Sequence, residues 1–431
     1  MQRTLRIAAL QLSAHDRAAF RERLPALLER VAAAAADAEL LVVPEGTMPA
    51  YVLGEPGIDG AAPQEAIEGL RAIAQANRCV IVAGVAKAVD RELRNSAIVI
   101  DADGSTAGRA DKIFLWHFDR KWFAPGDELT PIRTSLGVLG VMICADGRMP
   151  GIGRALVDAG AELLVMPTAW VTSGRNAAAL ENVQADLLAQ VRAFENNVPF
   201  VAANKCGVEN TMVAYCGKSQ IVDRDGSVIA LASERNEETL SATLSLQTPA
   251  PFRSPLPVPA PRGAAHDRAI RVAISPHGLP ADIERRLNVL DAELAIAPGA
   301  ATGIAALDRI VPTASLEADA ILDPGTLVAY RMAGYRCAIV VTNGEPHPWL
   351  ERVARARALE LRMYVIVLEP NRRAYAVDPD GICIAGTFDG FRIASFSLDA
   401  PRTQATAVAP GTDIATGIQR VASLSRRESR T

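Results

Sequence analysis

The chain has 431 residues, of which 49% are hydrophobic, and it carries a formal net charge of −4 at pH 7. That length exceeds one ordinary domain, and the apolar content is enough for two well-filled cores. The near-neutral balance, with lysine and arginine scattered along the chain, gives no indication of a nucleic-acid partner. No uncharged apolar run reaches the roughly 18 residues that a membrane span requires. We therefore expect a cytoplasmic protein with no membrane partner.

The six cysteines and five histidines are spread along the chain, without the CxxC pairs typical of zinc sites. We therefore expect no disulfide framework, no metal and no cofactor, and mostly buried thiols in a reducing compartment.

In the first half of the chain, short apolar runs with strand character alternate with helical stretches rich in alanine, leucine and arginine. Strands are predicted at 5–10, 40–43, 80–85, 97–100, 138–143, 163–166 and 200–203. Helices are predicted at 19–36, 66–76, 152–159 and 182–196. The pair Asp225-Gly226 predicts the turn of a hairpin over 217–230. This alternation is typical of an α/β domain with mixed strands.

A proline-rich stretch follows and holds six prolines between Pro249 and Pro261. Such a stretch cannot form a helix or a central strand, so it predicts an extended, semi-rigid linker. We expect a first domain over 1–247, the linker over 248–266, a second domain over 267–400 and a C-terminal tail over 401–431.

Beyond the linker the chain repeats itself, because five segments match five earlier segments in the same order. The pairs are 270–275 with 5–10, 292–299 with 38–46, 337–345 with 141–148, 357–367 with 192–202, and 378–386 with 223–230. These matches predict a tandem duplication. In the second copy Gly299 stands where Glu45 would be, Val341 stands where Cys144 would be, and the Lys112 segment has no counterpart. We expect that copy to be structural or regulatory.

Three short segments of the first copy each place one reactive side chain at or beside an apolar run. They are LVVPEG with Glu45, ADKIFLW with Lys112 and GVMICADGR with Cys144. A carboxylate, an ammonium and a thiol together can hydrolyse a carbon–nitrogen bond covalently. Each residue alone has an ordinary alternative: a buried strand cysteine, a loop glutamate or a strand lysine. The polar turn ADGR, however, exposes Cys144 at the carboxyl end of a strand, where open α/β sheets place reactive groups.

The order, spacing and flanks of these segments resemble the nitrilase superfamily, also called the carbon–nitrogen hydrolases. The resemblance spans about residues 5–246 and includes the motif Cys-x-x-x-Arg followed by Pro, formed here by Cys144, Arg148 and Pro150. It implies an α/β fold of the α-β-β-α sandwich type, present here as a tandem pseudo-repeat. Family members commonly pair two such sandwiches, so the second copy could supply an internal pseudo-dimer. A homo-oligomer is the alternative.

The resemblance also implies catalytic roles. Cys144 is the expected nucleophile and Glu45 the expected general base. Lys112 is expected to stabilise the oxyanion, assisted by the backbone N–H of Ala145. Lys121 competes with Lys112 for this role, although its position just before Trp122-Phe123 fits a wall residue better.

Two positions depart from the family pattern. Asp119 stands where the family usually has a second glutamate, and we expect it to support catalysis by holding Lys112 or the substrate. Gly151 stands after Pro150, where the family often has a glutamate.

Aromatic residues near these segments are candidates for the substrate pocket. By resemblance Trp170 would line the pocket, while Trp116 and His117 would lie near its mouth; plain core packing is the alternative. His117 also raises a rival mechanism, a Cys–His pair.

The predicted function is hydrolysis of a small linear amide or N-carbamoyl compound through a thioester on Cys144, with release of ammonia or an amine. The expected partner is thus a small-molecule amide substrate. Nitrile hydrolysis and acyl transfer remain alternatives, as does a non-catalytic small-molecule sensor or scaffold.

Overall fold

The computed structural model describes residues 3–54, 60–176, 178–249, 258–261 and 266–428, and the chain divides into two units. Unit 1 comprises residues 1–252, 409–412 and 419–431, and unit 2 comprises 253–408 and 413–418. Most of the predicted proline-rich linker lies outside the described residues. No helix in the described part of the chain is long and apolar enough to cross a membrane.

The strands of unit 1 are β1 (Arg3–Ser13), β2 (Leu40–Met48), β3 (Val80–Val89), β4 (Glu92–Ile100), β5 (Thr106–Asp111), β6 (Ile132–Thr134), β7 (Gly137–Val141), β8 (Leu163–Pro167), β9 (Phe200–Ala203), β10 (Lys205–Glu209), β11 (Val213–Cys216), β12 (Gln220–Val222), β13 (Val228–Leu231) and β14 (Glu238–Leu246). Its helices are α1 (Phe20–Ala35), α2 (Gln64–Asn77), α3 (Pro150–Asp158) and α4 (Ala189–Asn196), with short turns η1 (Arg17–Ala19), η3 (His117–Lys121), η4 (Cys144–Arg148) and the π-helical η5 (Gln184–Leu188). Every strand and helix predicted for the first half is present. The helix predicted over 182–196 is split, because its first part is the π-helical η5.

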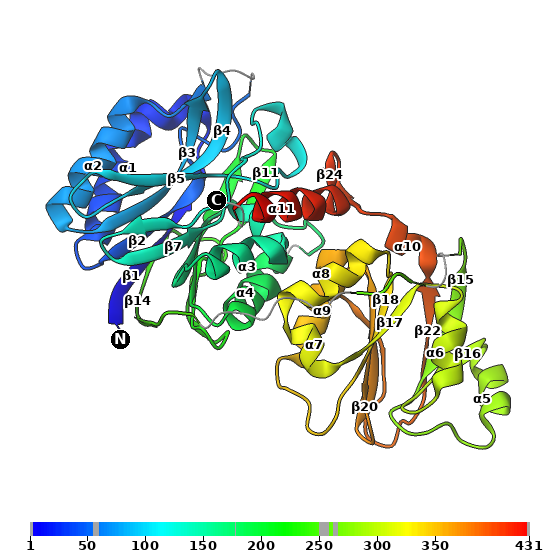
Figure 1. Ribbon diagram of the computed structural model, residues 1–431. Coiled ribbons are helices and arrows are strands. Elements are labelled where there is room, and N and C mark those ends of the chain that lie inside the picture. Colours follow the sequence, from blue (N-terminus) through cyan, green and yellow to red (C-terminus); the bar gives the residue numbers. More distant parts are fainter. Residues whose placement is uncertain (1–2, 55–59, 177, 250–257, 262–265, 429–431) are drawn as a thin grey trace. The chain divides into compact units, whose positions relative to one another are not determined.

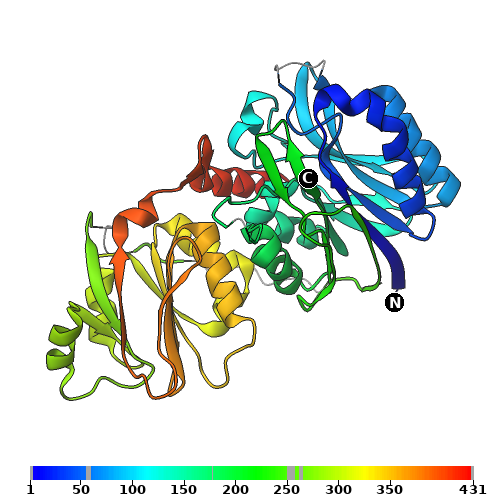
Figure 2. The same ribbon diagram turned by 180° about the vertical axis from the view of Figure 1, so that it is seen from behind.

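These strands form two sheets that pack face to face. One has the order β11-β10-β1-β2-β3-β4-β5, with β14 also paired to β1, and the other has the order β13-β12-β9-β8-β7-β6. Helices α1 and α2 cover the outer face of the first sheet, and α3 and α4 cover the second (Figures 1 and 2). The predicted α-β-β-α sandwich is therefore confirmed.

Both faces of the central strands are buried, which is why their sequences are continuous apolar runs. Every residue of β2 is buried, from Leu40 to Met48. Alternate residues such as Leu41 and Val43 belong to the core beneath α1 and α2. The other set of alternate residues in β2 faces the second sheet.

Unit 2 contains two smaller sheets. Its strands are β15 (Ala269–Ile274), β16 (Leu294–Ile296), β17 (Thr313–Glu317), β18 (Cys337–Val341), β19 (Tyr364–Glu369), β20 (Arg373–Val377), β21 (Cys383–Gly386) and β22 (Ala394–Asp399). Its helices are α5 (Ile283–Leu290), α6 (Ala301–Asp308), α7 (Ala318–Leu322), α8 (Pro324–Ala333), α9 (Leu350–Leu361) and α10 (Ala400–Gln404). The sheet orders are β16-β15-β22 and β17-β18-β19-β20-β21.

Strand pairing in unit 2 repeats part of the pairing in unit 1. Strand β15 pairs in parallel with β16 and antiparallel with β22, as β1 does with β2 and β14. Strands β17, β18 and β19 are parallel and lead into antiparallel β20 and β21, which is the pattern of β7, β8, β9, β12 and β13. These shared pairings agree with the predicted duplication, which stays a prediction.

The same strand order corrects one detail of the predicted repeat. In the predicted repeat, Val272 corresponds to Ile7. Because Ile7 pairs with Leu40 and Val272 pairs with Leu294, Leu294 corresponds to Leu40. Five residues further along each segment, Gly299 therefore corresponds to Glu45, as predicted. Strand β18, however, takes the place of β8, not of β7. Val341 therefore does not correspond to Cys144, whose counterpart lies near the end of β17.

The segment expected as a C-terminal tail is largely ordered. It contains β23 (Ala407–Ala409), β24 (Thr412–Asp413) and α11 (Ile414–Glu428). Residues 409–412 and those from 419 onward belong to unit 1, so the chain returns to its first unit after completing the second.

Candidate active site

Glu45 lies in a bulge of β2 that turns it out of the regular strand. Val43 pairs with Ala83 and Met48 with Val85, so the four residues 44–47 lie opposite Gly84 alone. A Cβ atom on Gly84 would lie 2.4 Å from the Cα atom of Glu45, a distance that real side chains do not reach. The bulge therefore requires glycine at position 84. It also takes Glu45 out of the regular pairing between β2 and β3, which changes the direction of its side chain.

The Glu45 carboxylate is fully buried, and only one of its two oxygens accepts hydrogen bonds from the described residues. Its Oε1 accepts hydrogen bonds from Asn95 Nδ2 at 2.6 Å and from Lys112 Nζ at 2.8 Å. Its Oε2 has no hydrogen-bond partner within the described residues. One oxygen thus fixes the carboxylate while the other is available to take a proton.

Lys112 follows β5 directly, and its ammonium is fully buried between two carboxylates. Its Nζ lies 2.8 Å from Glu45 Oε1 and 2.6 Å from Asp119 Oδ2. Desolvation lowers the pKa of Lys112, but the attraction to Asp119 and Glu45 has a larger effect. The pKa of Lys112 is therefore raised well above its usual value. Lys112 is therefore a permanent cation at this position.

Asp119 holds this cluster in place from the η3 turn. Its Oδ2 also accepts the backbone N–H of Trp116 at 2.9 Å, and its Oδ1 accepts the Tyr51 hydroxyl at 2.8 Å. The shorter side chain at this position thus still reaches Lys112, and its other contacts fix its orientation.

Cys144 begins the η4 turn after β7 and has a backbone φ of 46°. A non-glycine residue in this left-handed region is strained, and such strain is often found at functional turns. Burial raises the pKa of Cys144 to about 12, Glu45 adds to the rise and Lys112 opposes it. The sulfur therefore rests as a neutral thiol and needs a base before it can attack carbon.

The other predicted residues divide between this cluster and its surroundings. Ala145 is buried beside Cys144 in the turn, and Trp170 is fully buried just after β8. The Trp116 ring lies under the Arg148 guanidinium, 4.6 Å from its centre. His117 is exposed and its ring contacts Phe118, so the structure gives no support to a Cys–His pair.

Lys121 is exposed, so the structure places Lys112, not Lys121, against Glu45.

Sequence reasoning missed several polar residues that surround this cluster. Asn95 holds Glu45, and Tyr51 holds Asp119. Asn95 lies in the polar first half of β4, between Arg94 and Ser96, so its residue type gives no signal of its role. Nothing in the sequence distinguishes Tyr51 from an ordinary loop aromatic.

A buried lysine–glutamate ion pair near this cluster also escaped prediction. Lys205 Nζ lies 2.9 Å from Glu209 Oε2, and both side chains are almost fully buried. The Tyr215 hydroxyl donates to the same oxygen at 2.8 Å, and Glu209 Oε1 accepts the backbone N–H of Val52. Glu209 thus fixes the loop that carries Tyr51.

The returning C-terminal segment also touches the loops around the site. Thr412 Oγ1 accepts the backbone N–H of His117 at 2.6 Å, and Arg420 donates to the carbonyl of Gly126. A Cβ atom on Gly151 would lie 3.1 Å from Val421 Cγ1. Part of the space that a glutamate would need at position 151 is therefore taken by α11.

Within the described residues, no group of three or more histidine, cysteine, aspartate or glutamate side chains could hold a metal ion.

The family model of the carbon–nitrogen hydrolases matches residues 6–254, which is more than half of the chain. The chain belongs to this family. It is a carbon–nitrogen hydrolase of the nitrilase superfamily, as the three reactive segments predict.

Two relatives illustrate the similarity, and one of them is an amidase by name. A protein named "Hydrolase in pqqF 5'region" from Pseudomonas protegens is 35% identical over 226 residues, which cover 51% of this chain and 76% of the relative. The omega-amidase NIT3 of Saccharomyces cerevisiae is 26% identical, and the match covers 60% of this chain and 93% of the enzyme.

A solved carbon–nitrogen hydrolase from Helicobacter pylori is 27% identical, with a TM-score of 0.49, and the alignment covers 56% of this chain and 89% of that one.

Proposed function

We propose that the protein hydrolyses the carbon–nitrogen bond of a small linear amide or N-carbamoyl compound, through a thioester on Cys144. The observation that carries this proposal is the divided role of the Glu45 carboxylate. One oxygen is held by Asn95 and Lys112, and the other is buried without a partner among the described residues. A neutral, buried thiol needs such a base, and Glu45 raises the pKa of Cys144.

The reaction follows from this geometry. Glu45 takes the proton of Cys144 as the sulfur attacks the carbonyl carbon, and a tetrahedral oxyanion forms beside the Lys112 ammonium. Glu45 then passes the proton to the leaving nitrogen, the carbon–nitrogen bond breaks, and ammonia or an amine departs. Glu45 next takes a proton from water, whose oxygen attacks the thioester. The carbon–sulfur bond breaks, the carboxylic acid leaves, and the thiol recovers its proton.

More of the relatives are named as amidases than as nitrilases, although one relative is a probable nitrilase from Schizosaccharomyces pombe. Their names include an omega-amidase, an N-carbamoylputrescine amidase from Oryza sativa and a deaminated glutathione amidase from Yersinia enterocolitica. The loops 50–62 and 171–179, parts of which lie outside the described residues, are the proposed determinants of specificity.

We also propose that unit 2 carries no second catalytic centre of this kind. Gly299 occupies the position that corresponds to Glu45, and no strands equivalent to β3, β4 and β5 are present in the described part of unit 2.

The test measures ammonia release from a panel of small amides, N-carbamoyl compounds and nitriles, with wild type and Cys144→Ala. We expect amide or carbamoyl turnover by the wild type and a loss of at least about 10³-fold in Cys144→Ala. Cys383→Ala is the matched control, because Cys383 is an exposed thiol of unit 2, and it should retain full activity. Mass spectrometry of acid-quenched enzyme should show the acyl group on Cys144.

Turnover of nitriles alone would replace the amidase assignment with that of a nitrilase. Equal activity in wild type and Cys144→Ala would reject Cys144 as the nucleophile.

A further inference from the structure

Asp146 joins the segment of Lys112 to the turn of Cys144. Its side chain is 2% exposed and accepts three backbone N–H groups. Its Oδ1 accepts from Ile113 at 3.1 Å and from Phe114 at 2.8 Å, and its Oδ2 accepts from Ile143 at 3.0 Å. Ile113 and Phe114 directly follow Lys112, and Ile143 directly precedes Cys144. One carboxylate therefore fixes the backbone beside both reactive residues.

A second contact joins the same two segments. The Arg148 guanidinium, at the end of the η4 turn, lies over the ring of Trp116, 4.6 Å from its centre. Arg192 also holds the turn, because its Nε donates to the carbonyl of Gly147 at 2.9 Å. The turn is thus fixed by two further contacts, and Asp146 accepts its hydrogen bonds from the lysine segment.

We propose that Asp146 is a positioning residue for the hydrolysis proposed above: its carboxylate sets the separation between the Lys112 ammonium and the Cys144 sulfur. Lysine has a long, flexible stem, so the position of its charge depends on where its backbone is anchored. The strained backbone of Cys144, with a φ of 46°, likewise needs neighbours that hold it. A misplacement of about 1 Å between reacting groups can cost about 10²-fold in rate.

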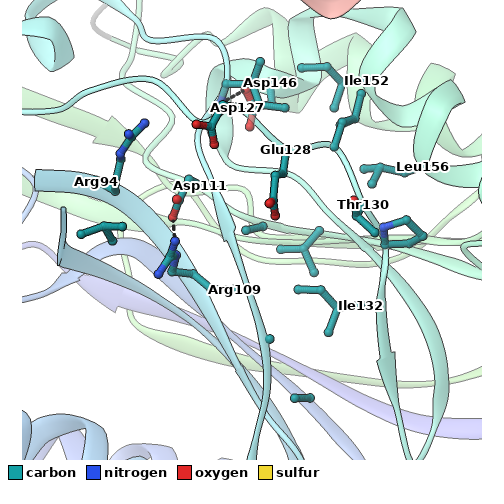
Figure 3. Close-up of a pocket in the computed structure, with 18 of the residues that line it drawn as sticks. Arg94, Arg109, Asp111, Asp127, Glu128, Thr130, Ile132, Asp146, Ile152 and Leu156 are labelled. Carbon is teal, nitrogen blue, oxygen red and sulfur yellow. Dashed lines mark hydrogen bonds and ion pairs between the residues drawn. The ribbon is translucent and has the colours of Figure 1, made fainter. Parts of the chain in front are cut away.

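The charge on Asp146 is sensitive to pH. Burial raises the pKa of Asp146 to about 7, against its three N–H donors and Lys112, which lower it. Asp146 also lines a cavity of about 520 Å³ behind the turn. The other charged residues that line the cavity are Asp90, Arg94, Arg109, Asp111, Asp127, Glu128 and Arg133. Figure 3 labels Arg94, Arg109, Asp111, Asp127 and Glu128 among them.

Protonation of Asp146 would place an O–H against a backbone N–H. It would therefore weaken the hydrogen bonds that connect the Lys112 segment to the Cys144 turn. Because the ionised carboxylate makes the three bonds, activity should be lost as the pH falls through about 7 and regained as it rises.

The test compares wild type with Asp146→Asn, which keeps the shape but turns an N–H₂ group toward one of the donors. We expect kcat to fall by about 10- to 100-fold, with KM changed less than about threefold. The acid limb of kcat/KM near pH 7 should disappear in the variant. Asp127→Asn is the matched control, because Asp127 is an exposed carboxylate on the same cavity and should keep both the rate and the acid limb.

An independent measurement needs no turnover and so separates this proposal from the proposed function. The rate at which iodoacetamide alkylates Cys144, followed by peptide mass spectrometry, measures the reactivity of the thiol directly. The proposal expects the rate to differ at least about fivefold between wild type and Asp146→Asn, and to be unchanged in Asp127→Asn. Equal alkylation rates in wild type and Asp146→Asn, or equal kcat with the same acid limb, would overturn it. Should Asp146→Asn fail to fold, a wild-type kcat/KM that is flat between pH 6 and 8 would do the same.

Discussion

Removal of the Lys112 charge tests the centre of the site. Lys112→Met keeps most of the stem but leaves Glu45 and Asp119 facing each other without a cation. Both carboxylates are fully buried, at 2.8 and 2.6 Å from the lost ammonium. Breaking one buried ion pair costs about 3–5 kcal/mol, because the remaining charge is buried without compensation. We therefore expect the free energy of unfolding to fall by about 3–5 kcal/mol at pH 7.5.

The same change should remove most of the activity. An oxyanion donor contributes about 10²–10³-fold to kcat. Turnover per folded molecule should therefore fall by at least about 10²-fold in Lys112→Met. Stability can be followed by tryptophan fluorescence, because Trp116, Trp122 and Trp170 all lie in unit 1 and only Trp349 lies in unit 2.

The chain offers a matched control for this experiment. Lys205 forms another buried ion pair, at 2.9 Å from Glu209, and makes no ion pair with Glu45 or Asp119 in the described structure. Lys205→Met should lose a similar amount of stability but less than about tenfold in turnover per folded molecule. Equal losses of turnover in the two variants would refute the reasoning, because they would show that Lys112 acts only through stability. Retention of more than about a tenth of wild-type kcat in Lys112→Met would refute it as well.

Two further changes test how the site is held. Gly84→Ala places a Cβ atom 2.4 Å from Glu45 Cα. The free energy of unfolding should therefore fall by at least about 1–3 kcal/mol, and kcat should fall by at least about tenfold. Gly278→Ala, where the added atom meets nothing within 4 Å, should leave both unchanged. Thr412→Val removes the oxygen that accepts the His117 N–H. The free energy of unfolding should fall by about 1 kcal/mol and kcat by a few-fold. An unchanged kcat would show that the C-terminal segment does not support the η3 turn.

The fold of unit 1 could be predicted because its strands are buried on both faces. Such strands are continuous apolar runs, and polar turn residues separate them from amphipathic helices. Residues 40–43 and 163–166 are examples, and both were placed correctly. The candidate residues Glu45, Lys112 and Cys144 could be found because each ends or adjoins such a run.

The partners of these residues could not be predicted, because they come from distant parts of the chain. Asn95 reaches Glu45 from a strand 50 positions away, and Tyr51 reaches Asp119 across 68 positions. Spacing along the sequence carries no information on such contacts. The assignment of Val341 failed for a related reason: β18 is more apolar than β17, so it resembled the nucleophile strand more closely than the strand that occupies the equivalent place.

The buried charges explain why the thiol can remain neutral at rest. Glu45, Lys112 and Asp119 together carry a net charge of −1, and a thiolate would add a second negative charge to a dry site. In the proposed reaction the proton moves to Glu45 as the sulfur attacks, so the negative charge passes from this carboxylate to the substrate oxygen and the total stays constant. Neutralised Glu45 then attracts Lys112 less strongly, and the ammonium becomes available to the oxyanion at the step that needs it. The cation is therefore held by a carboxylate in the resting enzyme and released toward the substrate by the same proton transfer that activates the nucleophile.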